Sequence, residues 1–247
     1  MRKILPFLFF LGLSIIQVHA QTADEVIDMY FETIGGKENI AKITSSISKA
    51  TAQAQGMELP ITMMSKAPNK QRMDINLQGR EITQMSFDGS VGWGTNFMTM
   101  EAEAWDSETS AVTGNTMSYP DPFLDYSSKG WKATIEGEEE IEGVPCHKLK
   151  LHRGMVTVGG EEKDDFSIYF MDKENGVIIM QRDISLTGPQ KGMTTETFYS
   201  DYDEVEGMFF PMTITAKSNG MEVFSAKITS MELNAEIDDA KFAMPKK

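Results

Sequence analysis

Alternation of apolar and polar residues with a period of two constrains the fold of this chain more than any other feature of its sequence. Every second residue is apolar in segments 57–63, 73–77, 85–87, 131–135, 166–170, 178–180, 208–214 and 224–228. Turn-forming pairs such as Asp88-Gly89, Asn175-Gly176 and Asn219-Gly220 separate these segments. Asn-Gly between alternating runs is the strongest short signal for a β-hairpin, so the pattern predicts about ten strands in an antiparallel meander.

Two helices are expected before the strands. Thr22 and Glu25 have the spacing of a capping box. An apolar stripe with helical spacing follows, formed by Val26, Ile27, Tyr30, Phe31 and Ile34. The glycine pair 35–36 ends this helix. A second, shorter helix is expected over residues 37–43.

The segment from Glu101 to Ser128 interrupts the alternation. It contains Trp105 and Val112, and then the run Tyr119-Pro120-Asp121-Pro122-Phe123-Leu124. A long insertion without strand periodicity inside a meander is usually functional or serves as a cover. We expect a loop with one or two short helices here.

The expected fold follows from how one long sheet can bury its apolar face. A sheet with a single apolar face must cover that face, and the helices available are too few to flank it. The sheet can instead curl around them. We therefore predict a mainly β protein with a few helices: an incomplete antiparallel β-barrel, made of a curled sheet of about ten strands and lidded by short helices. An apolar interior of this kind suits a ligand cavity.

The first twenty residues have the regions of a secretory signal peptide. A basic start is followed by an apolar stretch over residues 4–16, and Val18 and Ala20 provide the small residues of a cleavage site. We expect cleavage after Ala20 and one mature domain over residues 21–247. Gln21 stands where a lipidated protein would carry cysteine, so we expect this domain to be soluble and unanchored. Removal of the two basic residues takes the net charge from −14 to −16.

Charge and motifs exclude several classes of function. A surface this acidic repels phosphate backbones, which argues against nucleic-acid binding. Cys146 is the single cysteine, which excludes a multi-thiolate metal site. His147 and His152 should face opposite sides of one strand. The acidic run 201–207 has Glu206 where a calcium loop needs glycine. We expect no catalytic residues, no metal and no cofactor.

The apolar side chains are the remaining functional signal. Nineteen methionines are unusual for a chain of this length, and methionine fills adaptable apolar spaces. An ordinary core is the alternative explanation for most of these side chains. The residues expected near a ligand cavity are Met73, Ile75, Met85, Phe87, Phe97, Phe123, Leu124, Phe170, Met180, Phe210, Met212 and Phe224. A shift of one residue exchanges the two faces of a strand, and the sequence leaves both registers open.

Several short motifs resemble the periplasmic lipoprotein-sorting carriers, the LolA-like proteins, with their relatives LolB and the LppX-type lipid-binding proteins. They are spread over nearly all of the mature chain. The motifs are Ile34-Gly35-Gly36-Lys37 at a helix end, KAPNKQRM at 66–73, FDGSVGW at 87–93, DPFLDY at 121–126, YDEVEGMFFP at 202–211 and IDDAKF at 237–242. The resemblance implies an incomplete antiparallel barrel lidded by helices.

The resemblance also implies a function. It indicates a periplasmic carrier that binds the acyl chains of lipoproteins or lipids in an apolar cavity, in outer-membrane lipoprotein sorting, with an inner-membrane donor and an outer-membrane acceptor as its partners. Ala67 stands where the carrier has a functionally important arginine, which places lipoprotein release in doubt. A non-catalytic envelope sensor or interaction module on the same fold is the alternative. A hydrolase with dispersed residues is a third, which paired buried carboxylates in an unfilled cavity would favour.

Overall fold

The computed structural model describes residues 21–54 and 57–246, so the expected signal peptide, residues 1–20, lies outside the described residues. The helices are α1 (Ala23–Thr33), α2 (Lys37–Ile40) and α3 (Ser107–Thr116), with short 3-10 turns η1 (Tyr126–Lys129) and η2 (Asp239–Lys241). The strands are β1 (Ser45–Ala54), β2 (Met57–Lys66), β3 (Lys70–Leu77), β4 (Arg80–Phe87), β5 (Gly92–Asn96), β6 (Glu101–Ala104), β7 (Lys132–Ile141), β8 (Val144–Val158), β9 (Glu161–Asp172), β10 (Ile178–Ile184), β11 (Thr194–Val205), β12 (Met208–Ser218) and β13 (Met221–Leu233).

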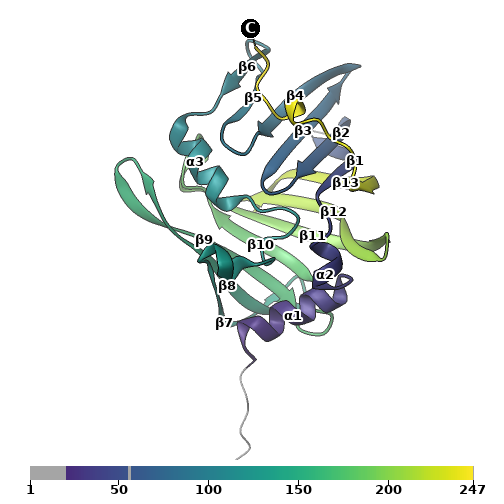
Figure 1. The fold of residues 1–247 in the computed structure, drawn as a ribbon, viewed down its shortest axis with the longest axis vertical. Coiled ribbons are helices and arrows are strands. Elements are labelled where there is room, and N and C mark those ends of the chain that lie inside the picture. The colour runs from purple at the N-terminus through teal and green to yellow at the C-terminus, as the bar shows by residue number, and fades with distance from the viewer. Residues whose placement is uncertain (1–20, 55–56, 247) are drawn as a thin grey trace, which may run out of the picture.

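These strands form one antiparallel sheet of 13 strands. Their order is β6-β5-β4-β3-β2-β1-β13-β12-β11-β10-β9-β8-β7, so β6 and β7 are the two edges and the sheet is an open, curled one. Figure 1 shows α1 and α2 across the lower strands, and α3 at the open side between β5 and β8. The predicted mainly β fold is confirmed, with more strands than the expected ten because short strands such as β5 and β6 lack a clear alternation.

Helix α1 begins and ends as the sequence predicts. The Thr22 side chain accepts from the Glu25 backbone N–H, and the Glu25 side chain accepts from the Thr22 N–H, which completes the capping box. Gly35 follows the helix with φ +111°, and a Cβ on it would lie 2.7 Å from the carbonyl oxygen of Gly207 in the β11–β12 turn. A side chain at position 35 would therefore push α1 off the sheet. Helix α2 is shorter than the predicted 37–43.

The C-terminal segment crosses the outer face of β1–β5 and covers it (Figure 1). The carbonyl oxygen of Phe242 accepts hydrogen bonds from Ser86 Oγ and from Trp93 Nε1, both at 2.8 Å. Phe242 itself is fully buried against Ala235 and Ile237. This tail seals the outer face, so the inner face of these strands is the side on which a ligand site can lie.

The segment 101–128 is only partly the loop that the sequence predicts. Its first residues form the edge strand β6, and α3 follows with Asp106 as its N-cap. The expected short helices are present as α3 and η1. None of the described helices combines the length and the apolar sequence that a bilayer crossing requires.

Candidate functional site

The inner face of the curled sheet divides into two apolar regions. Near α1 the interior is filled: Val26, Phe31 and Leu149 are almost completely buried in one core cluster. Away from α1, the inner face of β1–β3, β12 and β13 carries side chains that are only partly buried. We call this second region the apolar wall; its partly buried members are Leu59, Met63, Met73, Ile75, Met212, Ile214, Phe224 and Met231.

Strand register aligns the methionines of the apolar wall. Met63 on β2 pairs with Met73 on β3, and Met73 pairs with Met85 on β4. Directly opposed residues lie on the same face of a sheet, so these side chains form a row across three strands. Because methionine is flexible and polarizable, such a row can adapt to apolar ligands of different shape.

The opposite side of the interior is polar. We call it the polar wall, and it lies on β8–β11; its members are Arg153, Asp165, Ser167, Gln181, Asp183 and Tyr199. Arg153 donates to Asp165 Oδ1 through Nε and Nη2, at 3.2 and 2.8 Å, and to Ser167 Oγ at 2.9 Å. Ser167 and Gln181 donate to Asp183. Burial raises the pKa of the Asp183 carboxyl, while these hydrogen bonds and Arg153 partly offset the rise.

Helix α3 covers this polar wall. Asn115 Nδ2 donates to Asp165 Oδ2 at 2.6 Å, and the backbone N–H of Gly159 donates to Glu108 Oε1 at 2.5 Å. Both ends of α3 are thus tied to β8 and β9. On the other side, Gly114 lies against Phe87, where an added Cβ would come within 3.3 Å of the ring. The helix therefore bridges the two facing halves of the sheet.

The segment after α3 closes the interior from the α1 side. The Tyr119 backbone N–H donates to the carbonyl oxygen of Pro68 at 2.8 Å, and Asp121 accepts from the Tyr30 hydroxyl at 2.6 Å. Burial raises the pKa of Asp121. Phe123 is fully buried, with its ring 4.7 Å from that of Tyr169. This segment is held by both hydrogen bonds and packing.

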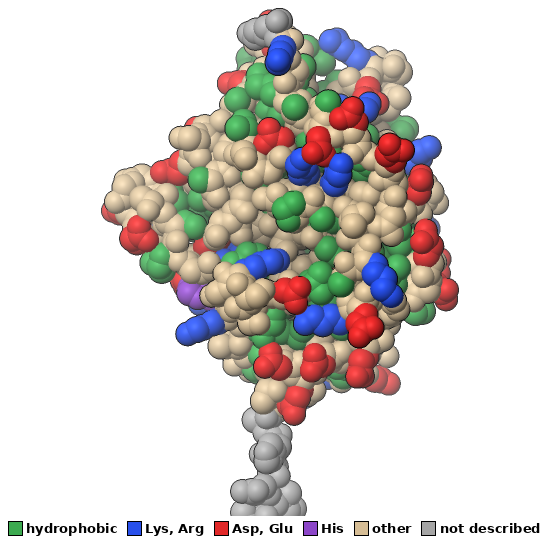
Figure 2. All heavy atoms as spheres, in the orientation of Figure 1, with side chains coloured by type: hydrophobic (Ala, Val, Ile, Leu, Met, Phe, Trp, Pro, Cys, Tyr) green, Lys and Arg blue, Asp and Glu red, His purple; other side chains and the backbone are tan. Residues whose placement is uncertain are grey.

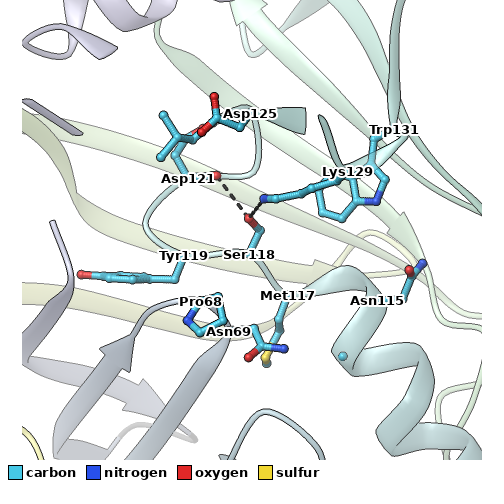
Figure 3. Close-up of a pocket in the computed structure, with 12 residues that line it drawn as sticks. Pro68, Asn69, Asn115, Met117, Ser118, Tyr119, Asp121, Asp125, Lys129 and Trp131 are labelled. Atoms are coloured by element: carbon cyan, nitrogen blue, oxygen red, sulfur yellow. Dashed lines mark hydrogen bonds between the residues drawn. The ribbon is translucent and has the colours of Figure 1, made fainter. Parts of the chain in front are cut away.

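A surface pocket lies on the outer side of this segment, and Figure 3 shows residues that line it. Its volume is about 460 Å³. Lys129 points across the pocket and donates to Ser118 Oγ at 2.6 Å, and Ser118 donates to the carbonyl oxygen of Asp121. Leu124 and Trp131 are among the residues that line it. The pocket is open and is lined by both polar and apolar side chains, and its hydrogen bonds serve to hold the loop.

Two pockets lie on the inner side of the same segment. The first, of about 320 Å³, reaches from Ser65 and Gln71 on β2 and β3 to the polar wall. The second, of about 190 Å³, lies beneath α1 and α2 and includes Phe210. Tyr169, Gln181 and Tyr199 line both pockets, together with Pro122. The first pocket has the volume of a small-ligand site.

A larger and more open hollow of about 950 Å³ lies at the far end of the interior. It is bounded by the β5–β6 hairpin and Trp105 on one side and by the loop of residues 185–190 on the other. Phe97, at 58% exposure, is on its rim. We call this hollow the mouth. Figure 2 shows a group of acidic side chains at the opposite end, over α1, and others spread over the rest of this face.

The structure separates the twelve residues expected near a cavity into groups. Met73, Ile75, Met212 and Phe224 belong to the apolar wall, and Met85 pairs with Met73. Phe87 is buried beside α3. Phe123, Leu124 and Phe210 belong to the core cluster near α1, and Phe97 lies at the mouth. Phe170 and Met180 pack in a third cluster with Cys146, on the outer face of the sheet.

The placement of Phe170 and Met180 differs from the expected inward position for a physical reason. Their outer face is covered by cationic side chains, since Arg182 lies 4.8 Å from the Phe170 ring and Lys150 lies 4.0 Å from the Phe166 ring. Aliphatic stems of arginine and lysine bury aromatic surface while their charges stay in water. An apolar run on this strand therefore marks the outer face.

The sequence pattern did not indicate the polar wall or the tyrosines beside it. The residues of β9 that point inward are Asp165, Ser167 and Tyr169. In the sequence, these residues have the pattern of the solvent-facing side of an alternating strand. The available signal was Arg153, which continues the alternating apolar positions Leu149 and Leu151 of β8. Buried arginines are almost always paired, so an acidic partner on a neighbouring strand could have been expected.

The described residues offer little chemistry for catalysis. Cys146 is buried, and burial raises the pKa of its thiol to about 11. No group of three or more metal-ligating side chains lies together in the described part of the chain. Asp165 is buried and Asp183 is partly buried, and together they are the kind of acidic pair that would favour the hydrolase hypothesis. Their oxygens accept from Arg153, from Ser167 and from the side chains of α3 and β10, so they act as structural acceptors.

Comparisons with solved structures show the family of folds. No protein-family model and no curated protein matches the sequence. A LolA superfamily protein from Nitrosomonas europaea superposes with a TM-score of 0.55 at 14% identity, over 91% of this chain and 98% of that one. A DUF1329 family protein from Desulfovibrio piger gives 0.53 at 12% identity, over 90% and 97%. A putative outer membrane lipoprotein-sorting protein domain from Vibrio parahaemolyticus gives 0.52 at 8% identity, over 88% and 94%. The chain has a LolA-like fold.

Proposed function

We propose that this protein is a periplasmic carrier that holds acyl chains of lipoproteins or lipids against the apolar wall. The observation that carries the proposal is the partial exposure of that wall. Met63, Met73 and Phe224 face the interior, yet no helix among the described residues packs over them as α1 does over the core cluster. The LolA-like fold supports a lipoprotein-binding role.

The energetics favour such a ligand. Transfer of a methylene from water to an apolar site is worth about 0.8 kcal/mol. A chain of roughly 15 methylenes would gain on the order of 12 kcal/mol before entropy and opening costs. A carrier must also release its cargo, so part of this gain has to be offset. Contacts that α3 and the segment 117–125 make in the empty protein are suited to that offset.

Export is part of the proposal. Residues 1–20 have the sequence of a signal peptide, and the protein is expected to begin at Gln21 and to stay soluble in the periplasm. The intact mass of the exported protein tests this. Retention of residues 1–20, or an added acyl mass, would contradict it.

Transfer from an inner-membrane donor to an outer-membrane acceptor is a further step of the proposal. Ala67 lies at the β2–β3 corner, where its backbone N–H donates to the carbonyl oxygen of Thr44. The methyl side chain cannot form the hydrogen bonds of an arginine. Binding of acyl chains does not depend on this position, whereas release coupled to a transporter would need another residue.

Native mass spectrometry of protein purified from a bacterial envelope is the direct test of binding. A co-purifying acylated molecule is expected. Met73→Glu, which places a carboxylate in the apolar wall, should weaken binding of a fluorescent acyl probe about tenfold or more. Met155→Glu is the matched control, because Met155 is exposed on the β8–β9 hairpin. Equal binding by both variants would contradict a site on the apolar wall.

An envelope sensor or interaction module without cargo is the second candidate. The filled interior near α1 favours it, because Phe31, Phe123 and Leu149 leave little space there. This candidate predicts that no acylated molecule co-purifies and that Met73→Glu has no effect on function. The same mass spectrometry experiment separates the two.

A further inference from the structure

We propose that the inner pocket beside Tyr169 binds the uncharged carbonyl linkage of an acylated molecule, an ester or an amide, and discriminates against a free carboxylate. The inference rests on the proposed function and deepens it, because it names the polar group that enters the interior along with the chain. The observation behind the inference is a buried hydrogen-bond donor that has no partner.

Tyr169 is that donor. It is 4% exposed, and its hydroxyl has no hydrogen-bond partner among the described residues. Neighbouring buried tyrosines differ: Tyr30 donates to Asp121, Tyr199 to Gln181 Oε1 at 3.1 Å, and Tyr202 to the carbonyl oxygen of Ile178 at 2.8 Å. A buried hydroxyl usually has a partner.

The Tyr169 hydroxyl reaches open space. Among the described residues, one side-chain polar atom is both fully enclosed and without a hydrogen-bond partner, and that atom is Ser218 Oγ on another strand. The Tyr169 hydroxyl also lacks a partner, but it is not fully enclosed. Tyr169 lines both inner pockets. Its ring is fixed between Phe123 and the sheet, which leaves the hydroxyl as the group that a ligand can meet. The site therefore presents one fixed donor and needs an acceptor.

The charges around the site select the kind of acceptor. Asp183 and Asp121 are the nearby acids, and burial raises the pKa of each. The nearby cation Arg153 donates to Asp165 and Ser167, and Asp165 balances its charge. A carboxylate placed here would meet two acids, while the charges of Arg153 and Lys129 already face Asp165 and Asp121, which is unfavourable in a buried site.

One cation also lines the first inner pocket, on the wall opposite Tyr169. Lys70 Nζ lies 2.6 Å from Asp239 Oδ2, at the outer side of the sheet, and Lys66 shares the same carboxylate. The charge of Lys70 is therefore directed to the C-terminal segment. A neutral carbonyl oxygen accepts from Tyr169 without bringing a charge into the pocket.

The position of the pocket also accounts for the acyl chain. Ser65 and Gln71 pair across β2 and β3 and line the pocket, and the next inward pair toward the mouth is Met63 with Met73. Successive inward pairs are about 7 Å apart along a strand. A molecule with its carbonyl at Tyr169 thus extends its chain along the apolar wall to the mouth.

Tyr169→Phe is the decisive variant, because it removes the hydroxyl and keeps the ring. The protein is exported from the full-length chain, purified and stripped of bound lipid, and then titrated with two probes that carry the same fluorescent chain. One probe is the glycerol monoester and the other is the free fatty acid, at pH 8. The unaltered protein should bind the ester more tightly than the acid. Tyr169→Phe should weaken ester binding by about 3- to 10-fold, as expected for loss of one buried hydrogen bond, and leave acid binding unchanged.

Tyr126→Phe is the matched control, since the Tyr126 hydroxyl donates to Asp24 outside both inner pockets. It should bind both probes as the unaltered protein does. Equal affinity of the unaltered protein for ester and acid would overturn the inference, and so would an unchanged ester affinity in Tyr169→Phe. Binding of neither probe would instead overturn the proposed carrier function. The unaltered protein alone gives the first comparison, so the test does not depend on the variant folding.

Discussion

Asn115, in the last turn of α3, donates through Nδ2 to Oδ2 of Asp165 on β9 at 2.6 Å. This contact joins the helix that covers the interior to the buried Arg153–Asp165 pair. Arg153 holds Asp165 from the other side at 2.8 Å. The carboxylate is thus held from the β8 side as well, so that α3 has a defined place to dock.

Asn115→Ala should loosen α3. The change leaves one oxygen of a buried carboxylate with Thr116 as its remaining partner from the helix, and we expect a loss of about 1–3 kcal/mol in the free energy of unfolding. Amide hydrogen exchange in residues 107–116 should become faster. Asn39→Ala is the control, because Asn39 makes a comparable hydrogen bond at an exposed site. Unchanged exchange in α3 would show that Asn115 does not hold the helix.

Asp239 gives a pH-dependent prediction for the C-terminal segment. Hydrogen bonds from Lys66 and Lys70 lower the pKa of Asp239 to about 2. A carboxyl whose pKa is lower in the folded state stabilises the fold above the pKa of the unfolded chain, about 3.9. This contribution is lost as the pH falls through about 2.

Asp239→Asn should therefore lower the urea midpoint at pH 7, and the difference from the unaltered protein should shrink between pH 4 and pH 2. The site is exposed, so the difference should be small and should decrease with salt. Glu236→Gln, at an exposed neighbouring site, is the control. A difference that stays constant down to pH 2 would mean that the Asp239 charge is not what anchors the segment.

Sequence patterns identified the apolar face of a strand well where its other face is an ordinary polar one, although they left open which face is the inner one. On β12 the inward residues Met212 and Ile214 are the apolar members of an alternating run. The helix α1 was predictable for the same reason, since its capping box and its apolar stripe are local features. In these elements, a single periodicity determines both the structure and the face that is buried.

The same reasoning fails on β9, because both of its faces are buried. Phe170 packs outward beneath Arg182, whereas Ser167 and Tyr169 point inward. A cation from another strand covers an aromatic ring only in the right register of the sheet. A local sequence pattern carries no information about that register. The polar wall depends on Arg153 meeting Asp165 across two strands. The candidate site could therefore be predicted on its apolar side only.

Cys146 should be without a role in binding. Its thiol is buried on the outer face, away from both inner pockets, and its pKa is raised to about 11, so little reactive thiolate forms at neutral pH. Cys146→Ala should keep the affinity for acyl probes and reduce the free energy of unfolding by about 1–2 kcal/mol. In the unaltered protein, a thiol reagent should react only after addition of denaturant. Rapid reaction in the folded state, or loss of binding in a folded variant, would indicate a functional thiol.

Phe123 and Leu124 test whether the segment after α3 is a cover. Phe123 is fully buried between Tyr30 and Tyr169, with ring distances of 6.0 and 4.7 Å, so Phe123→Ala should destabilise the empty protein by about 3–5 kcal/mol. Leu124 is partly buried on the outer pocket, and Leu124→Ala should cost about 1–2 kcal/mol. Both changes weaken contacts that close the interior. The affinity for an acyl probe should therefore stay level or rise.

Phe242→Ala is the matched control for this pair. Phe242 is as buried as Phe123 but belongs to the C-terminal segment on the outer face of the sheet, so its loss should lower the melting temperature without changing the affinity. Thermal melting with and without the probe, together with a titration, measures both effects for the three variants. A fall in affinity that accompanies the loss of stability in Phe123→Ala, but not in Phe242→Ala, would make Phe123 a direct ligand contact. The segment would then form part of the binding surface and would not have to move for the ligand to enter.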